Sequence, residues 1–399
     1  MTFTNRPSVH AVAALASMSL LSVGLMACAP SSGGAAAVEK TKAPAVELGI
    51  SDDGYTLEKL VEAAKKEGPL VISDSTGKIT DMAEAFTAKY GIKTTGVKQK
   101  TGEATEIAIR EAEAKNIQTD VYLLADAPIG QHDLIGRGIA TAWTPPDMAD
   151  KLDKDFTDPL VIGTDVMVWA YNTELYPDGC PVDNLWALTD EDWTAHVVME
   201  DPGLKTAIIY WVNEMATNHD DVMKKAYEDY FHENFSSDEK SATAEWFKRL
   251  AKNKPLLVKS GSDSAESAGA PGQKEAFMGL ASTAKFRENA DNGYKMGLCK
   301  GIAPYSAFAY TKLGLIANGT KSPNAAKLFI HYVLTEEGIA PQVEDGKFSS
   351  NRDVPPAADE PSGILDIWDQ VYIAQRDMLG ENYDTLPEWT DFWTAANHS

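Results

Sequence analysis

The chain has 399 residues, 44% of them hydrophobic, and its 36 Lys and Arg against 59 Asp and Glu give a formal net charge of −23. So acidic a surface argues against a nucleic-acid-binding protein and against broad contact with an anionic membrane. It does not exclude an anionic ligand, because local donors rather than net charge determine what a cleft binds. The length exceeds one comfortable hydrophobic core, so we expect two domains.

The first 28 residues have the features of an export signal. Arg6 precedes the apolar stretch Ala11–Met26, which is too short and too early for a membrane-spanning helix. The stretch ends in Leu25-Met26-Ala27-Cys28, which is typical of a bacterial lipobox. We therefore expect residues 1–28 to be a lipoprotein signal peptide and Cys28 to be lipidated. The alternative is an ordinary signal peptide with an incidental cysteine.

Residues 29–51 are predicted to be a flexible tether, because they open with a Gly/Ala/Ser tract that cannot bury a core. No later segment has the apolar length of a membrane span, so we expect a protein held by its lipid on the extracytoplasmic side of the envelope. The kind of envelope stays open. Export also permits a disulfide between Cys180 and Cys299, but we expect two buried free thiols and keep the disulfide as the alternative.

The first strand and helix of the folded part enclose a candidate anion site. Leu70–Ile72 suits a buried strand, and Ile79, Met82, Ala83 and Phe86 share one face of the helix that follows. The turn between them leaves the first helical N–H groups unpaired, next to hydroxyls and an ammonium group that favour an anion. The candidate ligand residues here are Ser75, Thr76, Gly77 and Lys78. The alternative is a capped turn that binds nothing.

The same turn is not a nucleotide-binding P-loop. That motif requires Gly where Ile72 stands and Ser or Thr where Ile79 stands. Two fixed positions fail, which argues against a nucleotide hydrolase.

Two further polar turns follow predicted strands. The strand Ile92–Val97 leads into a turn in which Thr101 is placed to cap a helix over 103–115, and Thr101 and Gly102 are candidate ligand residues. After Pro255 the strand Leu256–Val258 opens into a turn whose candidate ligand residues are Ser262, Asp263 and Ser264. Strands that alternate with helices predict βαβ units, a mainly parallel sheet and ligand loops at the strand ends. The three loops therefore suggest two lobes that face one cleft.

Between and after these loops, Leu160–Tyr171 is predicted to be a long strand and Ala325–Thr335 a helix. The tail over Ile364–Met378 is predicted to be helical. Its last aromatic residues, Trp389, Phe392 and Trp393, are expected to pack against a domain.

Five stretches of the mature chain, in this order behind a lipobox, resemble the substrate-binding lipoproteins of ABC importers. They are LEKLVEAAKKEGPLVISDS (57–75), DVYLLADAP (120–128), WAYNTEL (169–175), VVMEDP (197–202) and NAAKLFIHYVLTEEG (324–338). The branch that they resemble contains ferric-iron, sugar-phosphate, aminoethylphosphonate and thiamine binders. The resemblance implies an α/β, two-lobed type II periplasmic-binding-protein fold, in which each lobe is a mainly parallel sheet flanked by helices. It places residues 52–160 and 305–399 in one lobe, 161–304 in the other, and the ligand cleft between them.

The resemblance also bears on the ligand. Iron binders of this branch place two adjacent tyrosines shortly after the polar loop of the second lobe, whereas Gly279–Ala284 contains none and offers Ser282 and Thr283 as donors. Tyr305 and Tyr310 come later and are not adjacent. We therefore expect a small anionic solute, a sugar phosphate ahead of a phosphonate, with no metal and no cofactor. Ferric iron is the alternative.

The resemblance implies a monomer that closes its two lobes on the ligand and delivers it to an ABC permease and its ATPase. An exported hydrolase is the rival from another class, but the histidines are scattered, and neither HExxH nor GxSxG occurs. A structural scaffold would need repeats, which the sequence lacks. We therefore expect a binding protein rather than an enzyme.

Overall fold

The computed structural model describes residues 48–399, which lie within one compact unit. The predicted signal peptide, Cys28 and most of the predicted tether lie outside the described residues. Within 48–399, strands form one continuous mixed sheet in the order β2-β1-β3-β10-β5-β8-β6-β7, with β4 and β12 on β10 and β9 and β11 on β5. No helix in this part of the chain combines the length and apolar character needed to cross a membrane.

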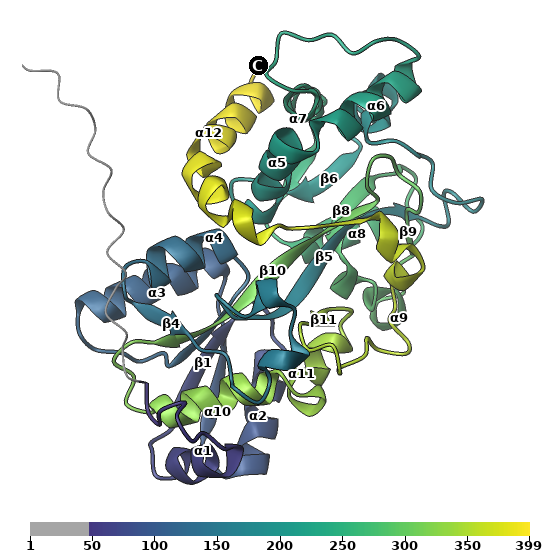
Figure 1. Cartoon of the computed structure of the whole chain (residues 1–399). Coiled ribbons are helices and arrows are strands. Elements are labelled where there is room, and N and C mark those ends of the chain that lie inside the picture. Colours follow the sequence, from purple (N-terminus) through teal and green to yellow (C-terminus); the bar gives the residue numbers. More distant parts are fainter. Residues whose placement is uncertain (1–47) are drawn as a thin grey trace, which may run out of the picture. The chain divides into compact units, whose positions relative to one another are not determined.

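Two long antiparallel strands, β5 (Val161–Asn172) and β10 (Ala307–Ala317), run through the middle of the sheet (Figure 1). The second half of β10 pairs with β3, and the second half of β5 pairs with β8. We call the part built on β1–β3 the first lobe and the part built on β6–β8 the second lobe. Their strands are β1 (Leu70–Asp74), β2 (Thr94–Lys98), β3 (Val121–Leu124), β6 (Val197–Glu200), β7 (Leu256–Val258) and β8 (Met278–Ser282). The short strands are β4 (Ala140–Ala142), β9 (Met296–Leu298), β11 (Phe348–Ser349) and β12 (Val371–Ile373).

Helices cover both lobes. Those of the first lobe are α1 (Leu57–Ala64), α2 (Ile79–Tyr90), α3 (Thr101–Glu113), α4 (Ala127–Ile129), α10 (Pro323–Val333) and α11 (Glu336–Val343). The other helices are α5 (Thr206–Asn218), α6 (Asp220–Phe231), α7 (Ala242–Lys252), α8 (Gly261–Gly269), α9 (Glu288–Asp291) and α12 (Leu379–Asn397). β1 is parallel to β2 and β3, and β6 is parallel to β7 and β8, so the carboxyl ends of these strands meet between the lobes.

The predicted strand, turn and helix at 70–90 are confirmed. Ile79, Met82, Ala83 and Phe86 of α2 are all buried. The ring of Phe86 lies 5.3 Å from Phe329 and 5.5 Å from Tyr332, both on α10. The amphipathic pattern of this helix was therefore a sufficient guide to its buried face.

The position of α12 differs from the expectation that all of 305–399 belongs to the first lobe. Trp389 and Trp393 are buried in the hydrophobic core that α5 and α7 also form. The ring of Trp393 lies 4.5 Å from Phe247 of α7. An aromatic side chain can pack in the hydrophobic core of either lobe. The sequence pattern of α12 therefore predicts that these residues are buried, but not which lobe they pack against.

The predicted helix over Ile364–Met378 is wrong in its middle. Two short 3-10 segments flank β12, which pairs in parallel with Ala307–Ala309 of β10. Val371-Tyr372-Ile373 is a run of β-branched and aromatic residues, which favour strands. It pairs with the first half of β10, whereas β3 pairs with the second half.

Cys180 and Cys299 form a disulfide across 119 residues, with their Cα atoms 5.1 Å apart. The expectation of two free thiols is therefore wrong. The pairing depends on tertiary structure: Cys299 directly follows β9 and its amide donates to the carbonyl oxygen of Trp169 in β5, and the chain that follows β5 brings Cys180 to it. The spacing of Cys180 and Cys299 along the sequence does not indicate that they are close in the fold.

Candidate functional site

The loop between β1 and α2 lies at the interface of the two lobes. Its donors are already directed at the carboxylate of Asp74: the amide of Thr76 lies 3.3 Å from Asp74 Oδ1, and the Ser75 hydroxyl lies 3.4 Å from the same atom. The Thr76 hydroxyl accepts from the amide of Lys78 at 3.3 Å. Gly77 is exposed, and a Cβ at this position would meet no atom within 4 Å. The donors of the loop are therefore directed at Asp74 and at the Thr76 hydroxyl, which is the arrangement of a capped turn.

The second predicted loop begins its helix earlier than expected. Lys100 is the N-cap of α3 and Thr101 is already helical, so the prediction that Thr101 caps a helix over 103–115 is wrong. Gly102 is exposed, with open space where a Cβ would lie. Lys100 Nζ reaches the carbonyl oxygen of Lys259 at 3.5 Å, so this loop of the first lobe faces the β7–α8 loop of the second.

In the β7–α8 loop the three predicted residues separate. Ser262 is exposed and its hydroxyl accepts from Lys285 Nζ at 2.8 Å, while Asp263 is exposed beside it. Ser264 is fully buried and donates to the carbonyl oxygen of Leu280 at 2.8 Å. The structure therefore does not place Ser264 among the exposed polar groups, because one further step along the helix turns its side chain toward the sheet.

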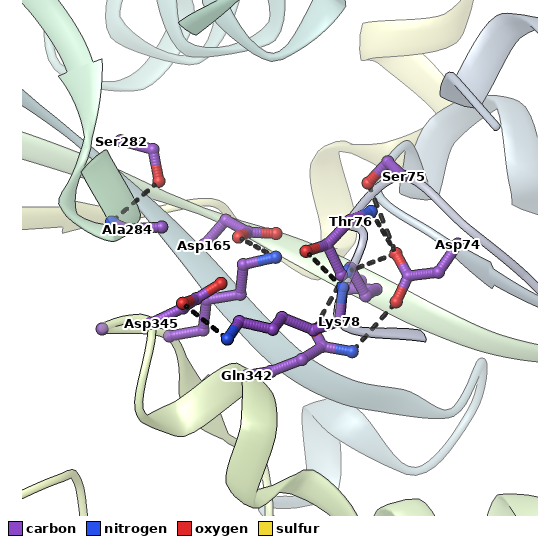
Figure 2. Close-up of polar contacts among 12 residues, drawn as sticks. Asp74, Ser75, Thr76, Lys78, Asp165, Ser282, Ala284, Gln342 and Asp345 are labelled. Atoms are coloured by element: carbon purple, nitrogen blue, oxygen red, sulfur yellow. Dashed lines mark hydrogen bonds and ion pairs between the residues drawn. The ribbon is translucent and has the colours of Figure 1, made fainter. Parts of the chain in front are cut away.

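Ser282, at the end of β8, caps the short 3-10 turn Thr283–Lys285, and its hydroxyl accepts from the amide of Ala284 at 3.3 Å. Figure 2 shows Ser282 on one side of a group of charged side chains and Ser75 on the other. Thr283 is buried, and its hydroxyl donates to the carbonyl oxygen of Gly346 at 2.7 Å. Of the two hydroxyls in this turn, that of Ser282 is the one that remains partly accessible.

The charged group between the lobes was not predicted. Lys312 is buried in the middle of β10, and its Nζ lies 2.8 Å from Asp74 Oδ1 and 3.1 Å from Gln342 Oε1. Lys347 pairs with the buried Asp165 of β5 at 3.2 Å. Lys205, just before α5, donates to the hydroxyl of Tyr310 at 2.7 Å.

The pKa shifts follow from this packing. Burial alone would raise the pKa of Asp165, but Lys347, Lys312 and Lys205 outweigh it and lower that pKa to about 2. Burial lowers the pKa of Lys312 despite its contact with Asp74. Burial, with Lys205 opposing it, raises the pKa of Tyr310 to about 12. The Tyr310 phenol is therefore neutral at physiological pH.

A second charged group links the lobes directly. Asp345, which is buried, lies 3.7 Å from Lys78 Nζ in the first lobe and 2.5 Å from Arg287 in the second. Lys285 lies nearby, and burial, then Arg287, then Lys98 lower its pKa. Both lobes therefore bring cations to one buried carboxylate.

The two groups together are cationic, although the chain as a whole is strongly acidic. Seven cations take part, namely Lys78, Lys98, Lys205, Lys285, Arg287, Lys312 and Lys347. Five carboxylates oppose them, namely Asp74, Asp165, Glu200, Glu288 and Asp345. We call these twelve residues the charged cleft. Among the described residues, no group of three or more His, Cys, Asp and Glu is arranged to hold a metal ion.

Two lobes joined by long crossing strands, with polar loops at the facing strand ends, define the class of two-lobed periplasmic binding proteins. The sequence profile described as "Bacterial extracellular solute-binding protein" matches residues 70–346, and the chain belongs to this family. Its members act outside the cytoplasm as the solute-binding components of ABC importers, and the chain is such a component.

Solved structures support the fold. Iron-bound HitA from Pseudomonas aeruginosa superposes with a TM-score of 0.64 at 16% identity, covering 82% of this chain and 99% of that one. AfuA from Actinobacillus pleuropneumoniae, with fructose-6-phosphate bound, gives 0.61 at 19% identity, with 83% and 99% covered. IdiA (FutA) from Trichodesmium, with iron and citrate, gives 0.59 at 14%, with 83% and 100% covered. No curated protein sequence matched the chain significantly. Identities this low establish the fold and not the ligand.

Proposed function

We propose that this solute-binding protein captures a small organic anion, most simply a phosphate ester such as a sugar phosphate, in the charged cleft. The observation that carries the proposal is the excess of cations between the lobes of a chain whose net charge is −23. Lys285, Arg287 and Lys78 are partly removed from water, and an anion that enters between them would supply opposite charge to all three. Among the neighbours, AfuA was solved with fructose-6-phosphate.

Ferric iron is the second candidate, because HitA and IdiA were solved with iron. The charged cleft disfavours it on two grounds. Its excess positive charge repels a bare cation. Burial raises the pKa of Tyr310 to about 12, more than Lys205 lowers it, and this opposes formation of the phenolate that would bind Fe³⁺.

The predicted ligand residues enter this proposal with different roles. Ser75, Thr76, Gly77, Lys78, Ser262 and Ser282 border the charged cleft and are proposed as donors. Thr101 and Gly102 are proposed to act from the neighbouring loop, and Asp263 to accept from ligand hydroxyls. We further propose that a lipid on Cys28 anchors a monomer, and that the lobes divide near residues 160 and 305, with α12 on the second lobe.

A thermal-shift screen of the purified protein tests the ligand class. The panel contains fructose-6-phosphate, aminoethylphosphonate, inorganic phosphate, thiamine and Fe³⁺ with citrate. A ligand at 100 times its Kd stabilises the folded state by about 2.7 kcal/mol, which appears as a shift of roughly 2–4 °C for a chain of this size. We expect the shift with phosphate compounds. A shift with iron alone would contradict the proposal and direct attention to Tyr305 and Tyr310.

A further inference from the structure

A cavity of about 1200 Å³ lies beside the charged cleft. It is bordered by the chain after β3, by α5, by β10 and β12, and by the start of α12. None of the predicted ligand residues lines it, and Tyr310 is the only aromatic residue that it shares with the contacts of the charged cleft. This volume is above the usual range for a small-molecule site, so it has room for a ligand and its water.

The deep wall of the cavity is aromatic. Trp211 of α5 and Phe308 of β10 stack with their ring centroids 4.9 Å apart and their planes at 9°. Tyr210 and Tyr372 continue the wall on either side, and all four residues are buried. Trp211 Nε1 is buried and has no hydrogen-bond partner among the described residues, so the wall retains a donor that the protein itself does not satisfy.

Two buried carboxylates lie in the same wall, and only neutral groups contact them. Asp126 accepts from Thr206 Oγ1 at 2.6 Å and from the Tyr210 hydroxyl at 2.9 Å. Glu214, one helical turn after Tyr210, accepts from the Tyr372 hydroxyl and from Asn382 Nδ2, both at 2.7 Å. Neither carboxylate takes part in an ion pair with any residue of 48–399. Burial raises the pKa of both carboxyl groups and outweighs the hydrogen bonds to each and, at Asp126, the opposing effect of Lys205.

The cavity lining as a whole contains more acidic than basic side chains. The lining contains the acids Asp126, Asp150, Asp153, Asp155, Glu214 and Asp377 and the cations Lys154, Arg352 and Arg376. Arg352 pairs with Asp153 at 3.0 Å and Arg376 approaches Asp155 at 3.9 Å, so two of the three cations are already engaged. The cavity is therefore anionic, opposite in sign to the charged cleft.

We propose that this cavity is a second binding site, specific for a small organic cation of the ammonium class. Aromatic ring faces attract cations, and aromatic walls combined with carboxylates are the usual means of recognising quaternary ammonium groups. Asp126 and Glu214 supply the balancing charge from within the wall, where the low dielectric makes it effective. Lys205, just before α5, does not line the cavity and donates to the Tyr310 hydroxyl, and its ammonium group lies over the Tyr310 ring.

Titration calorimetry with two probes of the same shape tests this site on the unaltered protein. Choline carries the charge, and its neutral analogue 3,3-dimethylbutan-1-ol does not. We expect choline to bind and the neutral analogue to bind at least about tenfold more weakly, the loss of one charged contact. Absence of choline binding, or equal binding of the two probes, overturns the proposal.

The variant Glu214→Gln locates the site. We expect choline affinity to fall about tenfold or more, while fructose-6-phosphate binding keeps its wild-type value. Glu67→Gln is the matched control, because Glu67, shortly after α1, also accepts backbone N–H groups, here from Asn324 and Ala325 of α10, and lies outside the cavity. Circular dichroism confirms that each variant is folded. If Glu214→Gln does not fold, the comparison of the two probes decides. Unchanged choline affinity in a folded Glu214→Gln protein overturns the proposal.

Discussion

Lys312 and Asp74 form the most buried ion pair of the charged cleft, with side chains 3% and 0% exposed. Gln342 contacts both partners and completes their hydrogen bonds. Removal of one member leaves the other charged, buried and without its main partner, which costs far more than the pair itself contributes. The pair therefore matters for folding as well as for the shape of the β1–α2 loop.

We predict that Asp74→Asn lowers the free energy of unfolding by about 3 kcal/mol, at the lower end of the range for a broken buried pair because Asp165 still faces Lys312. Urea denaturation followed by circular dichroism measures it. Asp178→Asn, at an exposed turn, is the control and should change stability by less than about 0.5 kcal/mol. If Asp74→Asn loses no more unfolding free energy than Asp178→Asn, the buried charge of Lys312 does not need Asp74 as its partner.

The second prediction at this scale concerns pH. The pKa of Lys285 is lowered by burial and by Arg287 and Lys98, and a bound anion would raise it again. The protonated lysine therefore binds the anion more tightly, and affinity for fructose-6-phosphate should fall, by roughly tenfold, as the pH rises from 7.5 to 10. Lys285→Arg keeps its charge over this range and should flatten the profile.

Calorimetry at a series of pH values measures this effect. The phosphate group is a dianion throughout the range, so its own titration does not contribute. Identical pH profiles for the wild-type protein and Lys285→Arg would exclude Lys285 from the site.

At the scale of the element, the disulfide closes a long segment of the second lobe. It joins the chain after β5 to the chain after β9, 119 residues apart. Chain-entropy arguments assign a loop of this length about 4–5 kcal/mol, while measured values are more often 2–4 kcal/mol. Because export permits the bond, we expect it to be a main contributor to stability.

We therefore predict that the double variant Cys180→Ser/Cys299→Ser loses about 2–4 kcal/mol of unfolding free energy relative to the oxidised wild type. Denaturation of the wild-type protein with and without a reducing agent is the matched comparison. If reduction and the double variant both leave stability unchanged, the second lobe does not depend on the bond.

Elements with local signals were predictable from sequence. The apolar run at Leu70–Ile72 and the amphipathic face of α2 predict the first strand, turn and helix. The long strands β5 and β10 each contained a visible clue to the site, because Asp165 and Lys312 are charged residues inside otherwise apolar runs. A buried charge in a strand needs an oppositely charged or hydrogen-bonding partner. Here Lys312 pairs with Asp74, and Asp165 pairs with Lys347, all within the charged cleft.

Features that depend on tertiary contacts were not predictable. The aromatic residues of α12 packed on the second lobe, Val371–Ile373 paired with β10, and the two cysteines met through β5 and β9. Ser264 differs from its predicted exposure for a different reason. It continues a run of polar residues, but the helix begins at Gly261 and turns that position toward the sheet.

At the scale of the whole molecule, Asp345 connects the lobes. Its carboxylate contacts Lys78 in one lobe and Arg287 in the other, two of the cations that we assign to the anionic solute. Asp345 and the solute therefore compete for the same charges. Closure of the lobes on a solute must rearrange these contacts.

We predict that Asp345→Asn binds fructose-6-phosphate several-fold more tightly than the wild-type protein, because it removes the competing negative charge. Calorimetry at one fixed salt concentration measures the change. Asp366→Asn is the control, since Asp366 pairs with Lys300 on the exposed surface. Weaker binding by Asp345→Asn would instead make Asp345 a residue that positions the cations.

The most direct test of the central claim is the affinity for fructose-6-phosphate of wild-type protein, Lys285→Gln and Lys225→Gln, measured by titration calorimetry under one condition. Lys285 lies in the charged cleft, whereas Lys225 pairs with Asp229 on the exposed face of α6. Loss of a charged contact predicts about 10- to 100-fold weaker binding for Lys285→Gln and unchanged binding for Lys225→Gln. Equal affinities for the three proteins, or no binding of the phosphate ester by the wild type alongside tight binding of Fe³⁺, would contradict it.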